Sequence, residues 1–571
     1  MLFPTIRFAI FFAMVLPASW LLTPHPLGRG ERERRAQPWA LPVLLVALGA
    51  LAGPLAPTGW PGAARGVGWL VAIGAVVLGA VRWWDLQGLA RWNVFILVAS
   101  YLFYGNYAWP FVALLAGSTI FNQIAATTIY RSEDDRRRRI LVTGAVAVNL
   151  GLLGWFKYKG FFLDSASSLL HPLGIAIDPP ARSLLPPVGI SFFTFCALSY
   201  VIDVYRHKVR PSPLLDFAVY LSFFPHLVAG PIVRASEFLP QLRRTRDARQ
   251  IDAGLAFWLI TIGLFKKVVV SSYLASAIVD PVFRIPEQHQ AIDTLLGVYG
   301  YAIQIYCDFS GYTDMAIGLA LLLGFRFPQN FDAPYTAASL QDFWRRWHMT
   351  LSRWLRDYVY IPLGGNQQGA RRASVNMFLT MLIGGLWHGA AWTFVFWGAL
   401  HGGYLAWERH RSRTAELRRA ATQAVAGEAT DPDDDDLAGI EPTSKAGPLA
   451  ALHAFTDRLT PTQRLWAGRV TTFHVVCLGW VFFRAPSLGQ AFEVLGRFRH
   501  MGTGTGVNLL VVATIVAFLA SQFVPTGTVG RVQAAFSRMA AWQQAASLAA
   551  CLLVTNALSP TGVAPFIYFA F

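Results

Sequence analysis

The sequence predicts an all-α polytopic membrane protein. Apolar residues make up 54% of its 571 residues and charged residues only 14%, whereas an ordinary globular chain is about 25% charged. Mean hydropathy is +0.42, and apolar runs long enough to cross a bilayer recur from one end of the chain to the other. These observations exclude a disordered chain, a soluble nucleic-acid-binding protein and a disulfide-stapled scaffold.

The charge pattern supports the same class. The chain holds 48 Lys and Arg against 32 Asp and Glu, a net charge of +16. The basic residues stand in short clusters between apolar runs, such as Arg136 to Arg139. An excess of Lys and Arg is typical of cytoplasmic loops. We therefore expect a multi-pass membrane protein that contacts lipid and no nucleic acid. Its usage of amino acids, rich in Ala and Arg, indicates a bacterial source, and the plasma (inner) membrane is its expected location.

The apolar runs predict about 11 to 14 membrane segments, because a span needs about 20 mainly apolar residues. Some runs are broken by Gly and Pro, so interfacial or re-entrant helices are expected among them. The candidate segments lie near residues 5–22, 39–57, 66–83, 92–104, 108–127, 139–157, 184–204, 213–231, 252–275, 293–323, 375–407, 466–484, 506–522 and 541–557. Residues 293–323 and 375–407 are each long enough for a tilted span with a re-entrant piece, or for two short helices.

One stretch departs from this pattern. Residues 409–462 begin with an arginine cluster and continue into the acidic run Asp433 to Asp436. We predict a disordered cytoplasmic loop at 420–447, and a solvated linker explains it better than a regulatory tail. The predicted organisation is N-terminal spans with additional spans at 1–90, a core at 91–410, a partly disordered cytoplasmic loop at 411–462 and C-terminal spans at 463–571.

Motifs of soluble enzymes are absent from the sequence. It contains no GxSxG elbow, no Walker A loop, no HExxH and no GxGxxG after a predicted strand. Its four cysteines are far apart and form no CxxC, so we interpret them as small buried hydrophobic residues and predict no metal site. Polar residues inside apolar runs remain, and each is a functional candidate because burying it in hydrocarbon is costly.

His388 is the strongest candidate. It lies in GGLWHGAAW, residues 384–392. On one continuous helix, Gly384, Gly385, Ala391 and Trp392 share its face, and small residues there allow a second helix or a ligand to come close. A neutral imidazole at this depth can deprotonate a hydroxyl. The alternative is a structural histidine bonded to a neighbouring helix. His401 falls about 220° further around such a helix, so the two histidines form no metal pair.

Residues 339–362, SLQDFWRRWHMTLSRWLRDYVYIP, predict an amphipathic helix in the membrane interface. Ser339 and Asp342 can form a capping box at its start. Its basic face suits anionic lipid headgroups or the phosphates of a coenzyme, and His348 lies at the boundary of the two faces. The apolar stripe consists of Phe343, Trp347, Leu351, Trp354 and Tyr358, and the basic face of Arg346, Arg353 and Arg356.

Two further stretches carry polar or irregular sequence at membrane depth. Residues 304–314 place Asp308, Ser310 and Asp314 inside an apolar run, which predicts the lining of a water-filled passage or, alternatively, a hydrogen-bonded joint between helices. Residues 224–231, FPHLVAGP, predict a break inside a span. Irregular backbone is tolerated at that depth only where protein or a cavity covers it.

Taken together and in this order, these motifs resemble the membrane-bound O-acyltransferase (MBOAT) family, most of all its alginate O-acetylation branch. The similarity covers most of residues 90–410. The matching stretches are SYLFYG at 100–105, PVGISFFTF at 187–195, FPHLVAGPIV at 224–233, DFSGYTD at 308–314, residues 343–362 and residues 386–397.

The resemblance implies a funnel of helices and an acyl transfer across the bilayer. His388 matches the family's mid-membrane histidine and is expected to be the general base, and His348 matches a second histidine on the cytoplasmic side. The donor is expected to be acetyl-CoA or another acyl thioester, with no tightly bound cofactor. The acceptor is expected to be a hydroxyl of an exported polysaccharide or of an extracytoplasmic SGNH/GDSL-type partner. The predicted site has His388 and His348 as catalytic residues and, around the substrates, Asp308, Ser310, Trp344, Arg345, Arg346 and Trp387.

Two alternatives remain open at this stage. A transporter or flippase that exports a lipid or polymer also needs many spans with polar residues at depth, although it would more often show two halves with matching broken spans. A catalytically inactive scaffold that docks a partner is the other.

Overall fold

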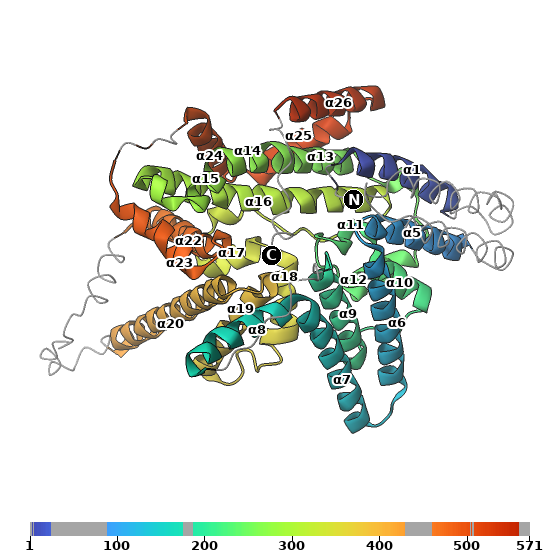
Figure 1. The fold of residues 1–571 in the computed structure, drawn as a ribbon, viewed down its shortest axis with the longest axis horizontal. Coiled ribbons are helices and arrows are strands. Elements are labelled where there is room, and N and C mark those ends of the chain that lie inside the picture. The colour runs from blue at the N-terminus through green and yellow to red at the C-terminus, as the bar shows by residue number, and fades with distance from the viewer. Residues whose placement is uncertain are drawn as a thin grey trace, which may run out of the picture. The chain divides into compact units, whose positions relative to one another are not determined.

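A computed structural model describes residues 3, 5–23, 88–174, 187–428, 459–502, 504 and 508–558. These residues form helices, turns and connecting segments, with no strand among them, which confirms the all-α prediction (Figure 1). Within them, four helical segments are long and apolar enough to cross a membrane: Trp109–Arg131, Asp135–Leu173, Ala253–Arg284 and Pro461–Arg484. The expected spans at 39–57 and 66–83 lie outside the described residues, so the total of about 11 to 14 segments stays a prediction.

The chain divides into two compact units that do not follow chain order. The first unit comprises residues 1–277, 303–330 and 524–571, and the second comprises residues 278–302 and 331–523. The four-part division into 1–90, 91–410, 411–462 and 463–571 stays a prediction about the sequence.

The first unit begins with α1 (Ile6–Leu22), whose cap is Thr5: its hydroxyl accepts the Phe8 N–H at 3.2 Å. Asp134 caps α7 by accepting the N–H groups of Arg136 and Arg137. The other helices are α5 (Gly88–Gly105), α6 (Trp109–Arg131), α7 (Asp135–Leu153), η1 (Gly154–Tyr158), α8 (Lys159–Leu170), η2 (His171–Leu173), α9 (Ile190–Tyr205), α10 (Leu214–Ser222), α11 (Phe224–Leu227), α12 (Ala235–Leu242), η3 (Ala248–Gln250), α13 (Ala253–Leu264), η4 (Phe265–Ser271), α14 (Ser272–Leu274), α25 (Thr526–Ser537) and α26 (Ala541–Leu558).

Three of the recognised motifs meet in the first unit. The Tyr104 hydroxyl donates to the Val188 carbonyl at 2.8 Å, and the Phe224 N–H donates to the Ser100 hydroxyl at 3.3 Å. Gly189 has a φ of +78°, and a Cβ there would lie 2.5 Å from the Leu227 carbonyl oxygen. Only glycine fits such a position. The predicted break at 224–231 is confirmed, because α11 ends after one turn at Leu227.

The second unit holds α15 (Asp280–Arg284), η6 (Pro286–Gln288), η7 (Pro334–Thr336), α17 (Leu340–Arg346), α18 (Met349–Leu355), η8 (Arg356–Tyr360), α19 (Gly369–His388), α20 (Trp392–Glu428), α22 (Pro461–Arg484), α23 (Leu488–Gly496), η9 (Arg497–Arg499) and α24 (Leu509–Ser521). Two helices, η5 (Ala275–Val279) and α16 (Ala291–Leu322), contribute residues to both units. A capping box of Thr460 and Gln463 begins α22.

Several sequence expectations need correction. Residues 293–323 form one helix of 32 residues, α16, rather than a span with a re-entrant piece or two short helices. The predicted disordered loop at 420–447 is wrong for its first part, because α20 continues to Glu428, and residues 429–447 lie outside the described part of the chain. Cys551 is exposed, whereas Cys196, Cys307 and Cys477 are buried as predicted.

Two glycines, which have no side chain, allow α13 and α16 to come into close contact inside the first unit. A Cβ on Gly263 of α13 would lie 2.5 Å from the Gly311 carbonyl oxygen of α16, and a Cβ on Gly311 would lie 2.7 Å from the Gly263 carbonyl oxygen. The two backbones therefore touch directly, which is the role of small residues between membrane helices.

We predict that Gly311→Ala separates α13 from α16 and destabilises the protein by about 1–3 kcal/mol, the usual cost of overpacking. Gly151→Ala in α7 is the matched control, because a Cβ there meets nothing within 4 Å. Thermal unfolding of the purified proteins in detergent measures the difference. Equal melting midpoints for the two variants would contradict the close approach.

Candidate active site

His388 is the last residue of α19, at the point where that helix turns back into α20 (Figure 1). The two helices lie side by side because glycines allow their backbones to touch. A Cβ on Gly385 would collide with the Phe394 carbonyl oxygen, and one on Gly398 would lie 2.6 Å from the Met381 carbonyl oxygen. The predicted close approach of a second helix beside His388 is therefore present, and the second helix is α20.

The expectation of one continuous helix through residues 384–392 is wrong. Residues 389–391 are non-helical, and α20 begins only at Trp392, which is 56% exposed. Ala391 and Trp392 therefore do not share a helical face with His388. Gly389 follows the last helical residue with extended backbone, and a Cβ there would collide with the Phe394 ring.

The imidazole of His388 is held among aromatic rings. It is 3% exposed. Its ring centroid lies 5.0 Å from Trp387, 5.1 Å from Trp397 and 5.2 Å from Phe483, and all three contacts are edge-to-face. Edge-to-face contacts at this spacing are favourable for aromatic pairs. Packing from α19, α20 and α22 therefore sets the orientation of the ring.

His348 belongs to the same cluster. Its ring lies 6.0 Å from Trp387, which in turn contacts His388. The side chain is fully buried, and burial lowers its pKa to about 3, so the imidazole is neutral at neutral pH. The structure thus gathers both predicted catalytic histidines around Trp387, although the sequence pattern placed His348 at the edge of a surface helix.

The backbone at His348 explains why residues 339–362 are not one helix. His348 has a φ of +42°, in the left-handed region that side-chain-bearing residues seldom occupy. Helix α17 therefore ends at Arg346, and α18 begins at Met349. The predicted capping contact is confirmed, because the Ser339 hydroxyl accepts the Asp342 N–H at 3.0 Å. The predicted apolar stripe is also confirmed as buried: Phe343, Trp347, Leu351, Trp354 and Tyr358.

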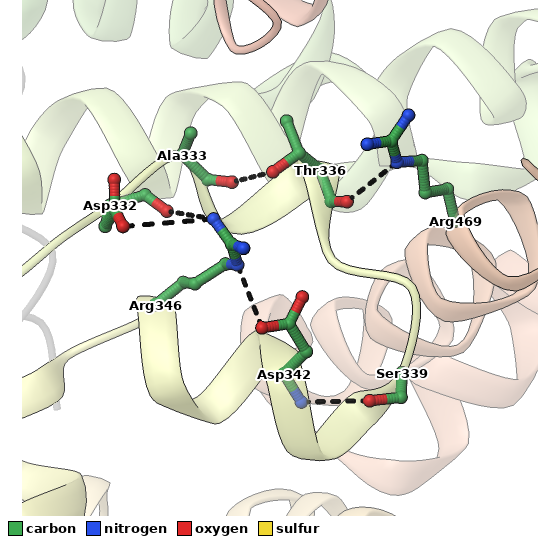
Figure 2. A network of polar contacts seen from close by, with 7 residues as sticks. All are labelled: Asp332, Ala333, Thr336, Ser339, Asp342, Arg346 and Arg469. Atoms are coloured by element: carbon green, nitrogen blue, oxygen red, sulfur yellow. Dashed lines mark hydrogen bonds and ion pairs between the residues drawn. The ribbon is translucent and has the colours of Figure 1, made fainter. Parts of the chain in front are cut away.

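Arg346 is held by carboxylates of the protein itself (Figure 2). Its Nε donates to Asp342 at 3.0 Å, and its Nη1 lies 3.8 Å from a carboxylate oxygen of Asp332. The Asp332 N–H also donates to the Arg346 carbonyl at 2.9 Å. These contacts fix the residue two positions before His348, whereas the neighbouring Arg345 is exposed. Of the two arginines predicted around the substrates, Arg345 is the more exposed.

Asp308 and Ser310 lie in α16, in the first unit. Asp308 forms an ion pair with Lys267 of η4, with both side chains at most 2% exposed. Asp314 pairs with Lys266 at 2.8 Å in a more accessible position. These contacts match the alternative of a polar joint between helices. Ser310 is buried, and the prediction that Asp308 and Ser310 contact substrate stays a prediction.

We predict that Asp308→Asn destabilises the protein by about 3–5 kcal/mol, because it leaves the Lys267 charge buried without its counter-ion. Asp314→Asn is the comparison and should cost less, since the side chains of Lys266 and Asp314 are 16% and 20% exposed, against at most 2% for Lys267 and Asp308. Thermal unfolding in detergent provides the measurement. The double variant Lys267→Met/Asp308→Leu should recover most of the loss, and failure to do so would argue against the pairing.

His401 also belongs to this site, although helical periodicity places it on a different face from His388. It was assigned to the far side of a helix shared with His388, but the break at 389–391 puts the two on different helices. Both rings contact Trp397, at 5.1 Å for His388 and 4.6 Å for His401. Gly389, a helix terminator directly after His388, was the sequence signal for this arrangement. Among the described residues, no group of three or more His, Cys, Asp or Glu side chains could hold a metal ion.

Comparison with known proteins identifies the family. A sequence profile described as MBOAT, membrane-bound O-acyltransferase family, matches residues 188–423. The probable alginate O-acetylase AlgI of Pseudomonas putida is 36% identical over 517 residues, which cover 85% of this chain and 96% of that protein. The chain belongs to the membrane-bound O-acyltransferase family.

Other relatives within the family act on different polymers according to their names. The peptidoglycan O-acetyltransferase of Helicobacter pylori is 35% identical over 452 residues, covering 73% of this chain and 76% of that protein. The teichoic acid D-alanyltransferase of Streptococcus thermophilus is 30% identical over 280 residues, covering 46% of this chain and 68% of that protein. The MBOAT profile covers α9 to α20, and so includes His348, His388 and His401.

Proposed function

We propose that this protein is an O-acetyltransferase of the plasma membrane that passes an acetyl group from a cytoplasmic thioester, acetyl-CoA, to a hydroxyl on the opposite side. The observation that carries the proposal is that two buried histidines, His348 and His388, contact the same residue, Trp387, in a member of an O-acyltransferase family. Membership in the family and the names of its acetylating relatives support an acetyl group over other acyl groups.

His388 acts as the general base. Its imidazole takes the proton of the acceptor hydroxyl as the oxygen attacks the thioester carbonyl, and a tetrahedral oxyanion forms. The carbon–sulfur bond then breaks, the ester remains on the acceptor, and the leaving thiolate receives the proton from the imidazolium of His388. The imidazole is regenerated, and the free thiol departs. The fixed ring orientation favours this proton transfer because it requires no rearrangement.

His348 donates a hydrogen bond to the oxyanion. A neutral imidazole carries one N–H donor and one acceptor nitrogen, and burial keeps His348 neutral. A buried donor that is already in place stabilises developing negative charge more than one in water. The exposed guanidinium of Arg345, three residues away along the chain, is suited to the phosphates of the donor.

The acceptor is a hydroxyl of an exported polysaccharide, or of an SGNH/GDSL-type partner that then modifies the polymer. Relatives named for alginate, peptidoglycan and teichoic acid support a polymer of the cell surface as the final acceptor. Their names describe acyl transfer, which favours an enzyme over the transporter and scaffold alternatives.

We expect His388→Ala to lower the rate of acetyl transfer by about 10²–10⁴-fold, the usual contribution of a general base. The assay follows thiol release from acetyl-CoA by the purified protein in the presence of the polysaccharide or the SGNH-type partner. His410→Ala, an exposed histidine of α20, is the control and should retain the wild-type rate. Full activity of His388→Ala in correctly folded protein would rule out the mechanism.

We expect His348→Gly to lower the turnover rate by about 10²–10³-fold, the usual effect of removing one oxyanion donor, while the protein stays folded. Glycine adopts the left-handed backbone of this position, whereas His348→Ala should lose activity and also melt at a lower temperature than His348→Gly. Steady-state kinetics and thermal unfolding of both variants separate chemistry from conformation. Wild-type turnover in His348→Gly would show that His348 serves only the break between α17 and α18.

A further inference from the structure

A third buried imidazole, beside those of His348 and His388, has no hydrogen-bond partner among the described residues. His401 of α20 is fully buried, and neither of its ring nitrogens has a hydrogen-bond partner among the described residues. The indole N–H groups of Trp344, Trp397 and Trp480 are likewise buried without an acceptor in that part of the chain. A buried polar group left without a partner costs about 1–3 kcal/mol, so several in one place indicate a ligand that satisfies them.

These groups are in mutual contact. The His401 ring lies 4.6 Å from Trp397 and 5.6 Å from Trp344. Trp344 and Trp397 are 5.7 Å apart, and Trp397 and Trp480 are 6.1 Å apart. We name His401, Trp344, Trp397 and Trp480 the indole–imidazole cluster. Aromatic side chains together with a few polar atoms line many small-molecule sites.

Two features hold the cluster in place. A Cβ on Gly479 of α22 would lie 2.6 Å from His401 Nε2, so the absence of a side chain there leaves room for the imidazole. Glu408, two turns beyond His401 on α20, accepts the N–H groups of Leu340 and Gln341 at 2.8 and 3.2 Å. This contact fixes the start of α17 against α20 and so sets Trp344 against His401.

The cluster also connects the surface with the histidine pair. Trp344 is half-buried and stands next to the exposed Arg345 on α17. It contacts Trp397, and Trp397 contacts His388 at 5.1 Å. A substrate that extends along these contacting residues from Arg345 to His388 would pass the indole–imidazole cluster.

The hydrogen-bond donors and acceptors of the cluster indicate which part of the substrate it can bind. A neutral imidazole offers one donor and one acceptor, and each indole offers a donor only. The matching group presents an N–H to the imidazole and a carbonyl oxygen to the indoles, which describes a secondary amide. The pantetheine arm between the phosphates and the thioester of coenzyme A carries two secondary amides.

We propose that the indole–imidazole cluster binds a pantetheine amide of the thioester donor, with His401 accepting the amide N–H and Trp344 or Trp397 donating to the amide carbonyl. This inference rests on the proposed function and extends it, since it identifies which part of the donor the protein binds and which residues bind it. His401 is a binding residue and takes no part in the proton transfer.

The test compares His401→Phe with the wild type on two donors. Phenylalanine keeps the ring and its aromatic contacts but removes both ring nitrogens. With acetyl-CoA, the donor KM should rise about tenfold, the value of one net hydrogen bond, and kcat should change less. With S-acetyl-2-mercaptoethanol, a thioester without amides, the ratio kcat/KM of the variant should equal that of the wild type. Trp344→Phe should behave in the same way, and His401→Gln, which retains a donor and an acceptor, should recover part of the affinity.

Direct binding provides a readout without turnover. Titration calorimetry of coenzyme A into the protein in nanodiscs should show about tenfold weaker binding to His401→Phe. An equal loss with both donors would overturn the proposal in favour of a packing role for His401. A rise in the acceptor KM alone would overturn it in favour of a hydroxyl site. Failure of the proposed function is distinguishable, because then the wild type itself would release no thiol from acetyl-CoA.

Discussion

The close approach of α19 and α20 is the constraint on which the site depends. Glycine at positions 385 and 398 lets the two backbones touch, and any side chain there would have to displace a carbonyl group of the facing helix. Because the helices touch, the turn between them is tight, and His388 is left at a helix end instead of in a helix middle. Trp397, one turn and a half into α20, then comes back onto the His388 ring. The catalytic geometry is therefore a consequence of backbone packing, with aromatic rings filling the space that remains.

The two units use polar residues in opposite ways. In the first unit, carboxylates of α16 are neutralised by lysines of η4, so charges that are costly in hydrocarbon are paired locally. In the second unit, the polar atoms of the indole–imidazole cluster are neutral and have no hydrogen-bond partner among the residues that the structure describes. Paired charges stabilise one arrangement of helices, whereas unused neutral donors and acceptors are what a substrate site requires before the substrate binds. This contrast separates the structural polar residues from those we assign to binding.

The sequence was informative wherever a local pattern decides the structure. Composition and apolar runs predicted the helical membrane class, the Ser339 cap was predicted correctly, and the stripe from Phe343 to Tyr358 is buried as expected. Sequence patterns failed at two helix breaks, one at His348 and one after His388. The left-handed backbone of His348 and the break after His388 are set by tertiary packing, which overrides helical periodicity, so residues assigned to one face of a continuous helix came out on different elements. The same error hid His401, since its neighbours depend on where α20 begins. The pairing of Asp308 with Lys267 could not be foreseen either, because 41 residues separate them.

The two helix breaks that were not predicted, at His348 and after His388, also account for the chemistry. A histidine at a helix end, or in left-handed backbone between two short helices, projects from the helical surface and can share an aromatic neighbour with a residue far away in sequence. Trp387 is that neighbour, in contact with His348 at 6.0 Å and with His388 at 5.0 Å. Backbone that departs from regular structure is found preferentially at functional sites, where the surrounding fold compensates its cost. Here the compensation is visible in the carboxylates that hold Arg346, two residues before the strained position.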